Sequence, residues 1–306
     1  MASSPNFRGA LFMVVAMAGF TLNDTLVKAA SAGMNMGQVM LVRGLFATAL
    51  IGLLAWHRGA LAKPWIGLHP LIGVRAVGEL GGTVFYLIAL AHLPIGNVSA
   101  VFQALPLAVT MGAALFFGER VGWRRWLAIS VGFVGILIIV RPGMEGFTIY
   151  SVYTLICVAF CMLRDLATRR LPDDIPTLYV STFTAGIVTI SGGLLVQPMG
   201  GWSPLSFELL IYLLGASILL LIGYQFIIQA MRTGEVSFIA PFRYTSLLWA
   251  LLMGYLVFAD VPDMAVLVGS ALVIGSGLYM LYRERVVGRT KVVAESTRPD
   301  MAPDGV

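Results

Sequence analysis

Ionisable side chains lie within stretches of the sequence that are otherwise almost entirely apolar. Glu79 falls about ten residues into the apolar run 69–91, and Arg75 precedes it by four positions. On a helix this spacing places both side chains on one face, where they can form an ion pair. A charge in hydrocarbon is costly and usually faces a cavity or an opposite charge. We expect Glu79 to be a proton-coupling or ligand-binding carboxylate tuned by Arg75; the alternative is a self-neutralised structural pair.

Two further arginines occupy apolar runs without an acid beside them in the sequence. Arg43 lies about six residues into its run, where a guanidinium could hold a carboxylate or phosphate of a ligand. The alternatives are a side chain that snorkels to the lipid headgroups or a pair with Asp24. Arg243 and Tyr244 follow Pro241, which permits a local break in a helix. Membranes tolerate such a break only where it lines a cavity or packs on protein.

A similar arrangement occurs in the run 95–117, where Gln103 precedes Pro106. We expect Gln103 to face Arg243 and Tyr244 near the middle of the membrane and to form the substrate-binding site with them. Among the aromatic residues, Trp249 is expected to line the same cavity. The alternative is an interhelical hydrogen-bond network without a ligand.

Two more charged pairs stand near the ends of apolar runs. Asp24 and Lys28 are four positions apart, which favours a structural pair over a gate. Arg164 and Asp165 are adjacent, and we expect them to lie at the membrane interface.

The sequence has no constellation typical of a catalytic, metal or nucleotide site. It contains no GxSxG or HExxH motif, and its three histidines stand singly. No glycine-rich phosphate loop is present, which excludes pumping driven by ATP. Cys157 and Cys161 lack nearby histidine or acid ligands and are expected to be packing residues. We expect no catalytic residue, no metal and no cofactor.

The composition indicates the elements that must position these residues. Of the 306 residues 58% are hydrophobic and 11% charged, with a mean hydropathy of +0.89. Soluble domains carry about 25% charged residues, so we expect an all-α integral membrane protein. Runs of about 20 apolar residues predict transmembrane helices. Ten are predicted: 8–29, 37–57, 69–91, 95–117, 123–141, 147–168, 176–197, 205–231, 235–258 and 263–283.

The stretch 91–143 has a weaker copy at 230–283, which indicates two related halves of five helices each. We therefore predict a first repeat over 1–143, a second over 144–283 and a disordered cytoplasmic tail over 284–306. With the N-terminus in the cytoplasm, that side receives 14 of the 20 lysines and arginines, as the positive-inside rule requires. Five is an odd number, so the second half enters the membrane inverted. Glu119 then lies at the cytoplasmic face and its counterpart Asp260 at the outer face.

At this level of detail the sequence resembles the EamA-domain family of the drug/metabolite transporter superfamily. The resemblance rests on the block LPIGNVSAVFQALPL from Leu93, GERVGWRRW from Gly118, GFVGILIIVRPG from Gly132 and APFRYTSLLWALLMGYLVFADVPD from Ala240. It implies a carrier of small metabolites that works by alternating access without ATP. Pro106 has no counterpart at Leu247, where second halves of the family commonly carry a proline, so a kink of the ninth helix is not expected at that residue.

Inverted repeats are the construction from which many secondary transporters form two access states. We expect a transporter of a small metabolite in the bacterial inner membrane, with both termini cytoplasmic. Similarity favours a vitamin or nucleoside-like solute such as riboflavin. The alternatives are an exporter or exchanger of amino acids, S-adenosylmethionine or drugs and, more distantly, an intramembrane enzyme. The partners expected are the substrate and the lipid bilayer, without nucleic acid, and we allow for proton coupling and for a homodimer.

Overall fold

The computed structural model describes residues 5–61, 69–119, 121–144, 147–172, 175–233 and 235–287, and helices joined by turns make up this part of the chain. In chain order the helices are α1 Pro5–Ala30, α2 Met36–His57, α3 Pro70–His92, α4 Ile95–Phe102, α5 Leu105–Phe117, α6 Trp123–Val140, α7 Ile149–Arg169, α8 Thr177–Val196, α9 Phe207–Thr233, α10 Val236–Ile239, the 3-10 helix η2 Ala240–Tyr244, α11 Thr245–Phe258 and α12 Met264–Val287. The predicted all-α membrane fold is confirmed.

Within the described residues nine helical segments are long and apolar enough to cross a bilayer, with α4 and α5 taken together as one. The remaining predicted span, the ninth at 235–258, is divided among α10, η2 and α11. The boundary predicted between the repeats falls in the loop between α6 and α7. Helix α12 continues to Val287, and the predicted tail beyond it lies outside the described residues.

The fourth and ninth spans are both broken, at equivalent points. Between α4 and α5 the helix is interrupted at Gln103 and Ala104, and Pro106 stands in the first turn of α5. A proline there costs little, because the first turn of a helix has no partner for that amide. The ninth span has no proline at position 247, yet it is broken in the 3-10 segment that contains Pro241. The break of the ninth span thus lies before position 247, where second halves of the resembled family commonly carry a proline.

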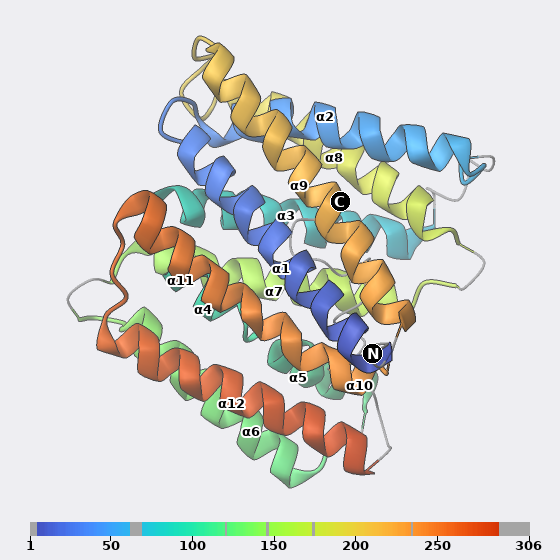
Figure 1. Ribbon diagram of the computed structural model, residues 1–306, viewed down its shortest axis with the longest axis vertical. Coiled ribbons are helices and arrows are strands. Elements are labelled where there is room, and N and C mark those ends of the chain that lie inside the picture. Colours follow the sequence, from blue (N-terminus) through green and yellow to red (C-terminus); the bar gives the residue numbers. More distant parts are fainter. Residues whose placement is uncertain are drawn as a thin grey trace.

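The helices of one half pack mainly on helices of the other half. The most extensive contacts join α1 with α9, α2 with α8, α3 with α7 and α6 with α12, and α4 also packs on α11. Figure 1 shows α1 beside α9 and α6 beside α12. If each helix is replaced by its counterpart in the other half, the α1–α9 pair becomes the α7–α3 pair. The pairs α2–α8, α6–α12 and α4–α11 each map onto themselves. This is the pairing expected of two halves related by a pseudo-two-fold axis.

Small residues allow some of these pairs to approach closely. A Cβ atom on Gly192 of α8 would lie 2.7 Å from the backbone nitrogen of Leu41 on α2. Where α6 meets α12, a Cβ on Gly135 would lie 2.7 Å from the carbonyl oxygen of Gly269. Small residues at helix interfaces are typical of membrane proteins, since lipid provides no hydrophobic force between helices.

Large apolar side chains cover the outside of the bundle. Leu53, Leu127 and Leu194 are 60%, 58% and 73% exposed, respectively. A water-soluble monomer rarely exposes so much contiguous apolar surface, so these side chains face the lipid. Several arginines and acids within the helices are buried instead, which gives the interior its polar character. They include Arg43, Arg75, Glu79, Arg164, Asp165 and Arg243.

Candidate functional site

Glu79 lies at the centre of a group of fully buried charges. Its Oε2 atom is 3.4 Å from Nη1 of Arg75, one turn earlier on α3, so the predicted pair is present. Its Oε1 atom is 3.5 Å from Nη1 of Arg164 on α7. The three side chains are at most 2% exposed. The carboxylate therefore bridges two guanidinium groups from two helices, which corrects the view of a self-contained pair on one helix.

Arg164 and Asp165 extend this group along α7. Nη2 and Nε of Arg164 are 2.7 and 2.8 Å from Oδ1 of Asp165. Neither side chain is exposed, so the pair does not reach the lipid headgroups, and its location at the depth of the membrane interface stays a prediction. The physical reason is the approach of α7 to α3, where a Cβ on Gly78 would lie 2.7 Å from the backbone nitrogen of Arg164. That approach turns Arg164 toward Glu79 rather than toward lipid.

Hydroxyl groups complete the surroundings of Arg75. Its Nε atom donates to Oγ1 of Thr168 on α7 at 3.1 Å, and its Nη1 atom donates to Oγ1 of Thr184 on α8 at 3.0 Å. These contacts join three helices through one guanidinium. Sequence reasoning missed both threonines, because single hydroxyls in apolar runs follow no pattern that singles them out.

Arg243 connects the charges to the broken ninth span. It is 7% exposed, lies in η2 and interacts electrostatically with Asp165. We call the five residues Arg75, Glu79, Arg164, Asp165 and Arg243 the buried charge network. It contains three guanidinium groups and two carboxylates, so its formal charges do not cancel.

The two breaks meet at Gln103, which forms a hydrogen bond with Ser246 rather than with Arg243 or Tyr244. Nε2 of Gln103 donates to the hydroxyl of Ser246 in the first turn of α11. The backbone oxygen of the same serine accepts a 3.4 Å hydrogen bond from the hydroxyl of Thr21 on α1. Gln103 and Ser246 therefore join the fourth and ninth spans where each is interrupted.

Tyr244 and Trp249 are directed elsewhere in this structure. The hydroxyl of Tyr244 lies against α12, where a Cβ on Gly277 would be 1.7 Å from Oη. The half-buried Trp249 packs on the apolar cluster between α1 and α9 that includes Phe20 and Tyr224. The expectation that both residues line one cavity with Gln103 stays a prediction.

Arg43 belongs to a second buried polar group, between α1, α2 and α3. Its Nη1 atom donates to Oδ1 of Asn23 at 3.2 Å, and Asn23 in turn donates to Oδ1 of Asp24 at 3.0 Å. Tyr86 of α3 donates its hydroxyl proton to Oδ2 of Asp24. Arg43 is 5% exposed, so it does not snorkel to the headgroups. The structure thus connects it with Asp24 through Asn23.

Lys28 has partners other than Asp24. Its Nζ atom donates to the carbonyl oxygens of Leu90 at 2.7 Å and Leu93 at 2.6 Å, where α3 ends. It also lies 5.3 Å from the ring centre of Phe258 and interacts electrostatically with Asp260. The structure therefore turns Lys28 toward the end of α3 and the end of α11.

The two cysteines are buried on α7, with their sulfur atoms 4.0 Å apart. Both are free thiols in the structure. Among the described residues no group of three or more histidine, cysteine, aspartate or glutamate side chains is arranged to hold a metal ion.

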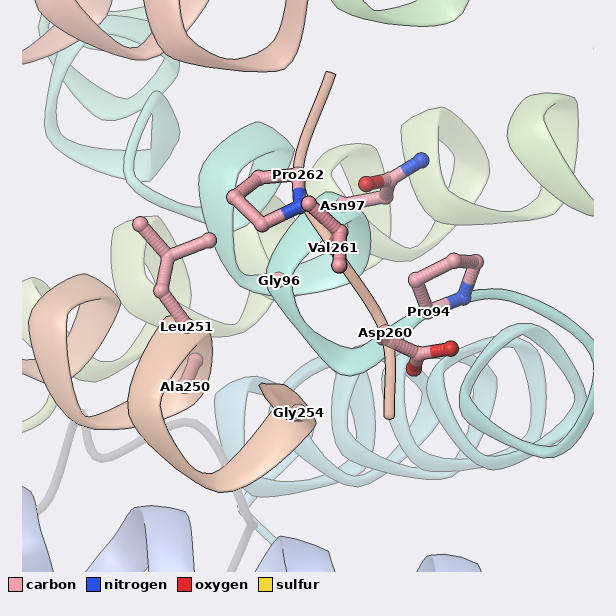
Figure 2. Close-up of a pocket in the computed structure, with 9 residues that line it drawn as sticks. All are labelled: Pro94, Gly96, Asn97, Ala250, Leu251, Gly254, Asp260, Val261 and Pro262. Carbon is pink, nitrogen blue, oxygen red and sulfur yellow. The ribbon is translucent and has the colours of Figure 1, made fainter. Parts of the chain in front are cut away.

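A pocket opens between α4 and α11, at the end of the bundle where α4 begins. It encloses about 230 Å³ including its open mouth and is lined by Pro94, Gly96, Asn97, Ala250, Leu251, Gly254, Asp260, Val261 and Pro262. Figure 2 shows the carboxylate of Asp260 beside Pro94, with Asn97 and Val261 further along the wall. The pocket thus lies on the line of contact between the two broken spans.

Comparisons with known proteins agree with this architecture. The sequence model of the EamA-like transporter family matches residues 7–141. An S-adenosylmethionine uptake transporter of Rickettsia felis is 24% identical over 90% of this chain and 92% of its own length. The pseudopaline exporter CntI of Pseudomonas aeruginosa UCBPP-PA14 is 28% identical, covering 87% and 93%. A riboflavin transporter of Vibrio cholerae is 27% identical, covering 87% and 90%.

The fold has a counterpart among solved structures. A protein of known crystal structure aligns with 91% of this chain and 98% of its own length, with a TM-score of 0.60 and 20% sequence identity. At that identity the likeness concerns the fold alone.

Proposed function

The chain belongs to the EamA family of the drug/metabolite transporter superfamily, and we propose that it carries a small metabolite bearing an anionic group by alternating access. In general terms the protein is a multi-pass membrane transporter of small metabolites that is related to bacterial transporters, and it is not an enzyme. The proposal concerns the solute class, the residues that hold the solute and the mechanism. Its basis is the unequal number of charges in the buried charge network.

A surplus positive charge inside a membrane protein is costly and usually serves a purpose. Three guanidinium groups share two carboxylates in the network, and Arg243 interacts with Asp165, the same acid that Arg164 binds. A carboxylate on the solute would supply the missing negative charge. Guanidinium groups suit that task, because their planar fork donates two parallel hydrogen bonds to one carboxylate.

The position of Arg243 supports its role as the residue that contacts the solute. It lies in η2, the short irregular segment of the ninth span, next to the junction of Gln103 with Ser246. Irregular backbone within a membrane frees polar groups that a ligand or protein must satisfy. In this proposal Gln103 and Arg243 hold the solute, Tyr244 and Trp249 reach it in another conformation, and Arg43 supplies a second cationic contact.

The solute itself is best identified by a panel that separates charge from shape. The relatives are named for S-adenosylmethionine, pseudopaline and riboflavin. S-adenosylmethionine and the amino acids carry an α-carboxylate, whereas riboflavin, the solute favoured by the sequence, carries none. We therefore predict that solutes with a carboxylate raise the melting temperature of the purified protein, as any ligand of the native state does. Stabilisation by riboflavin alone would contradict the anionic class and restore the sequence-based choice.

Replacement of Arg243 tests the site directly. We predict that Arg243→Ala lowers uptake of the stabilising solute into proteoliposomes at least tenfold, while the folded yield falls much less. The matched control is Arg232→Ala, since Arg232 is an exposed arginine in the last turn of α9. Equal losses of uptake and folded yield in Arg243→Ala would assign the residue to structure and reject its role in binding.

Coupling and orientation form a second part of the proposal. Glu79 is proposed as the carboxylate that couples proton movement to solute transport. Arg75 and Arg164 are the two cations that its carboxylate contacts in turn during the cycle. Glu79→Gln should then flatten the pH dependence of uptake, and an unchanged pH profile would reject this role. From the distribution of lysine and arginine we propose a bacterial inner-membrane location with both termini in the cytoplasm.

A further inference from the structure

Helices α5 and α11 end in the same way, although they belong to different halves. Each is capped by a residue in the left-handed conformation, Gly118 with φ 66° and Ala259 with φ 55°. An acid follows each cap, and the backbone amides of Glu119 and Asp260 donate to the carbonyl oxygens of Ala113 and Gly254 at 3.4 and 3.0 Å. Each of these residues at the end of α11 lies 141 positions after the corresponding residue at the end of α5.

An aromatic ring and a cation accompany each of these turns. Phe117 ends α5 and Phe258 ends α11, again 141 positions apart. The guanidinium of Arg170 lies 4.0 Å from the ring centre of Phe117, and Nζ of Lys28 lies 5.3 Å from that of Phe258. A cation over an aromatic face is attracted by the ring electrons.

Lys28 and Arg169, the neighbour of Arg170, occupy equivalent places. Lys28 lies in the last turn of α1, the first helix of its half, and Arg169 ends α7, the first helix of the other half. They too are 141 positions apart. The two sets of residues lie at opposite ends of the bundle, because Lys28 binds where α3 ends and α4 begins, whereas Glu119 follows the far end of the α4–α5 span.

The two ends nevertheless differ in one contact. Nη2 of Arg169 is 3.0 Å from Oε1 of Glu119, and both side chains are largely covered. At the other end Lys28 donates to the carbonyl oxygens of Leu90 and Leu93. Asp260 forms no ion pair within the described residues, and the pocket of Figure 2 opens beside it. One carboxylate oxygen of each acid, Oε2 of Glu119 and Oδ2 of Asp260, is buried without a hydrogen-bond partner among these residues.

We infer that Glu119 with Arg169 and Asp260 with Lys28 are two equivalent latches that close in alternation at opposite ends of the solute path. In the present conformation the Glu119 latch is closed, and the end with the unpaired Asp260 carries the pocket. To reach the other access state, Lys28 leaves the carbonyl oxygens at the end of α3 and pairs with Asp260, while Arg169 releases Glu119. This inference rests on the proposed alternating-access function and assigns residues that gate it.

The latches are testable without knowledge of the solute. In full-length protein carrying Cys157→Ser and Cys161→Ser, one reporter is Asn97→Cys in the pocket and the other is Ala113→Cys beneath the Glu119 turn. We measure how fast a hydrophilic maleimide labels each reporter in detergent. The reporter at position 97 should react and that at position 113 should be protected, since Ala113 is fully buried.

Opening the closed latch should reverse this pattern. Glu119→Gln should raise labelling at position 113 and lower it at position 97, each by about fivefold, the ratio that an ion pair at the strong end of the usual range maintains. Arg169→Gln should do the same and serves if Glu119→Gln folds poorly. Exchange of the charges, Glu119→Arg with Arg169→Glu, should restore the original pattern. Asp260→Asn should keep position 97 reactive, because it removes the acid that closes that end.

The control is Asp263→Asn, which alters another acid of the same loop, paired with Arg141. It should leave both reporters unchanged. The inference is overturned if Glu119→Gln changes neither reporter, if both reporters become more reactive together, or if Asp263→Asn gives the same shift. If the reporters respond as expected but no solute of the panel is transported, the latches stand and the proposed function fails. If solute is transported while the reporters do not respond, the latches alone fail.

Discussion

Removal of Arg164 is the perturbation whose effect the structure predicts most definitely. The side chain is completely buried, bridges to Glu79 at 3.5 Å and binds Asp165 through two nitrogen atoms at 2.7 and 2.8 Å. Arg164→Met keeps much of the volume and removes the charge, which leaves a buried carboxylate without its nearest cation. Breaking a buried ion pair in this way costs about 3–5 kcal/mol.

That free energy converts into a measurable change of the melting temperature. For large domains 1 kcal/mol corresponds to about 2–4 °C, so we expect Arg164→Met to lower the melting temperature by about 6–20 °C. Removing both charges, with Arg164→Met and Asp165→Leu together, also takes Asp165 from Arg243 but leaves no carboxylate without its nearest cation, and should lower it by less than the single change does. A large coupling between the two substitutions is the expected sign of a direct contact.

The chain provides its own reporter for this assay. Cys157 and Cys161 are 0% and 1% exposed, so a fluorogenic maleimide reacts with them only when the protein unfolds. Arg232→Met, at an exposed arginine, is the matched control and should leave the melting temperature unchanged. A melting temperature of Arg164→Met within about 2 °C of the unaltered protein would refute the reasoning, as would additive effects in the double variant.

Three further predictions concern packing, backbone and charge. Gly277→Ala should destabilise the protein by about 1–3 kcal/mol, because the new Cβ would lie 1.7 Å from Oη of the buried Tyr244; a normal melting temperature would show that the ring moves freely. Ala259→Gly should raise stability by about 0.5–1 kcal/mol, since the left-handed conformation at φ 55° strains alanine and not glycine; a lower melting temperature would contradict this. The amide of Val266 and the guanidinium of Arg141 hold the pKa of Asp263 below its usual 3.8. The charged carboxylate therefore stabilises the native state at pH values above 3.8, and this stability is lost as the pH falls through the lowered pKa. Asp263→Asn should therefore lower the melting temperature at pH 7, and the difference should vanish in acid; a difference independent of pH would contradict it.

The elements that depend on chain length and hydropathy could be predicted from the sequence. Each of the ten predicted spans corresponds to one helix or to two or three consecutive helical segments, because the bilayer thickness fixes how many apolar residues a helix needs. The Arg75–Glu79 pair could also be predicted, because it depends only on the four-residue spacing along one helix. The sequence also identified Glu119 and Asp260 as acids at corresponding positions of the two halves.

Contacts that depend on how helices rotate and approach could not be predicted. A membrane helix is apolar on nearly all sides, so its sequence does not show which face meets a neighbour. Arg164 reaches Glu79 only because Gly78 lets α7 approach α3, and Tyr244 points to α12 because Gly277 leaves room for its hydroxyl. The burial of adjacent Arg164 and Asp165 near a helix end could not be predicted for the same reason.

The opposition of the two halves is the claim on which the account depends most, and one labelling experiment tests it. Glu119→Cys and Asp260→Cys, each in the protein without its native cysteines, are treated in sealed right-side-out vesicles with a maleimide that does not cross the membrane. The account predicts that position 260 is labelled in intact vesicles and that position 119 is labelled only after the membrane is opened. Labelling of both positions from the same side would contradict it, because the halves would then not be inverted.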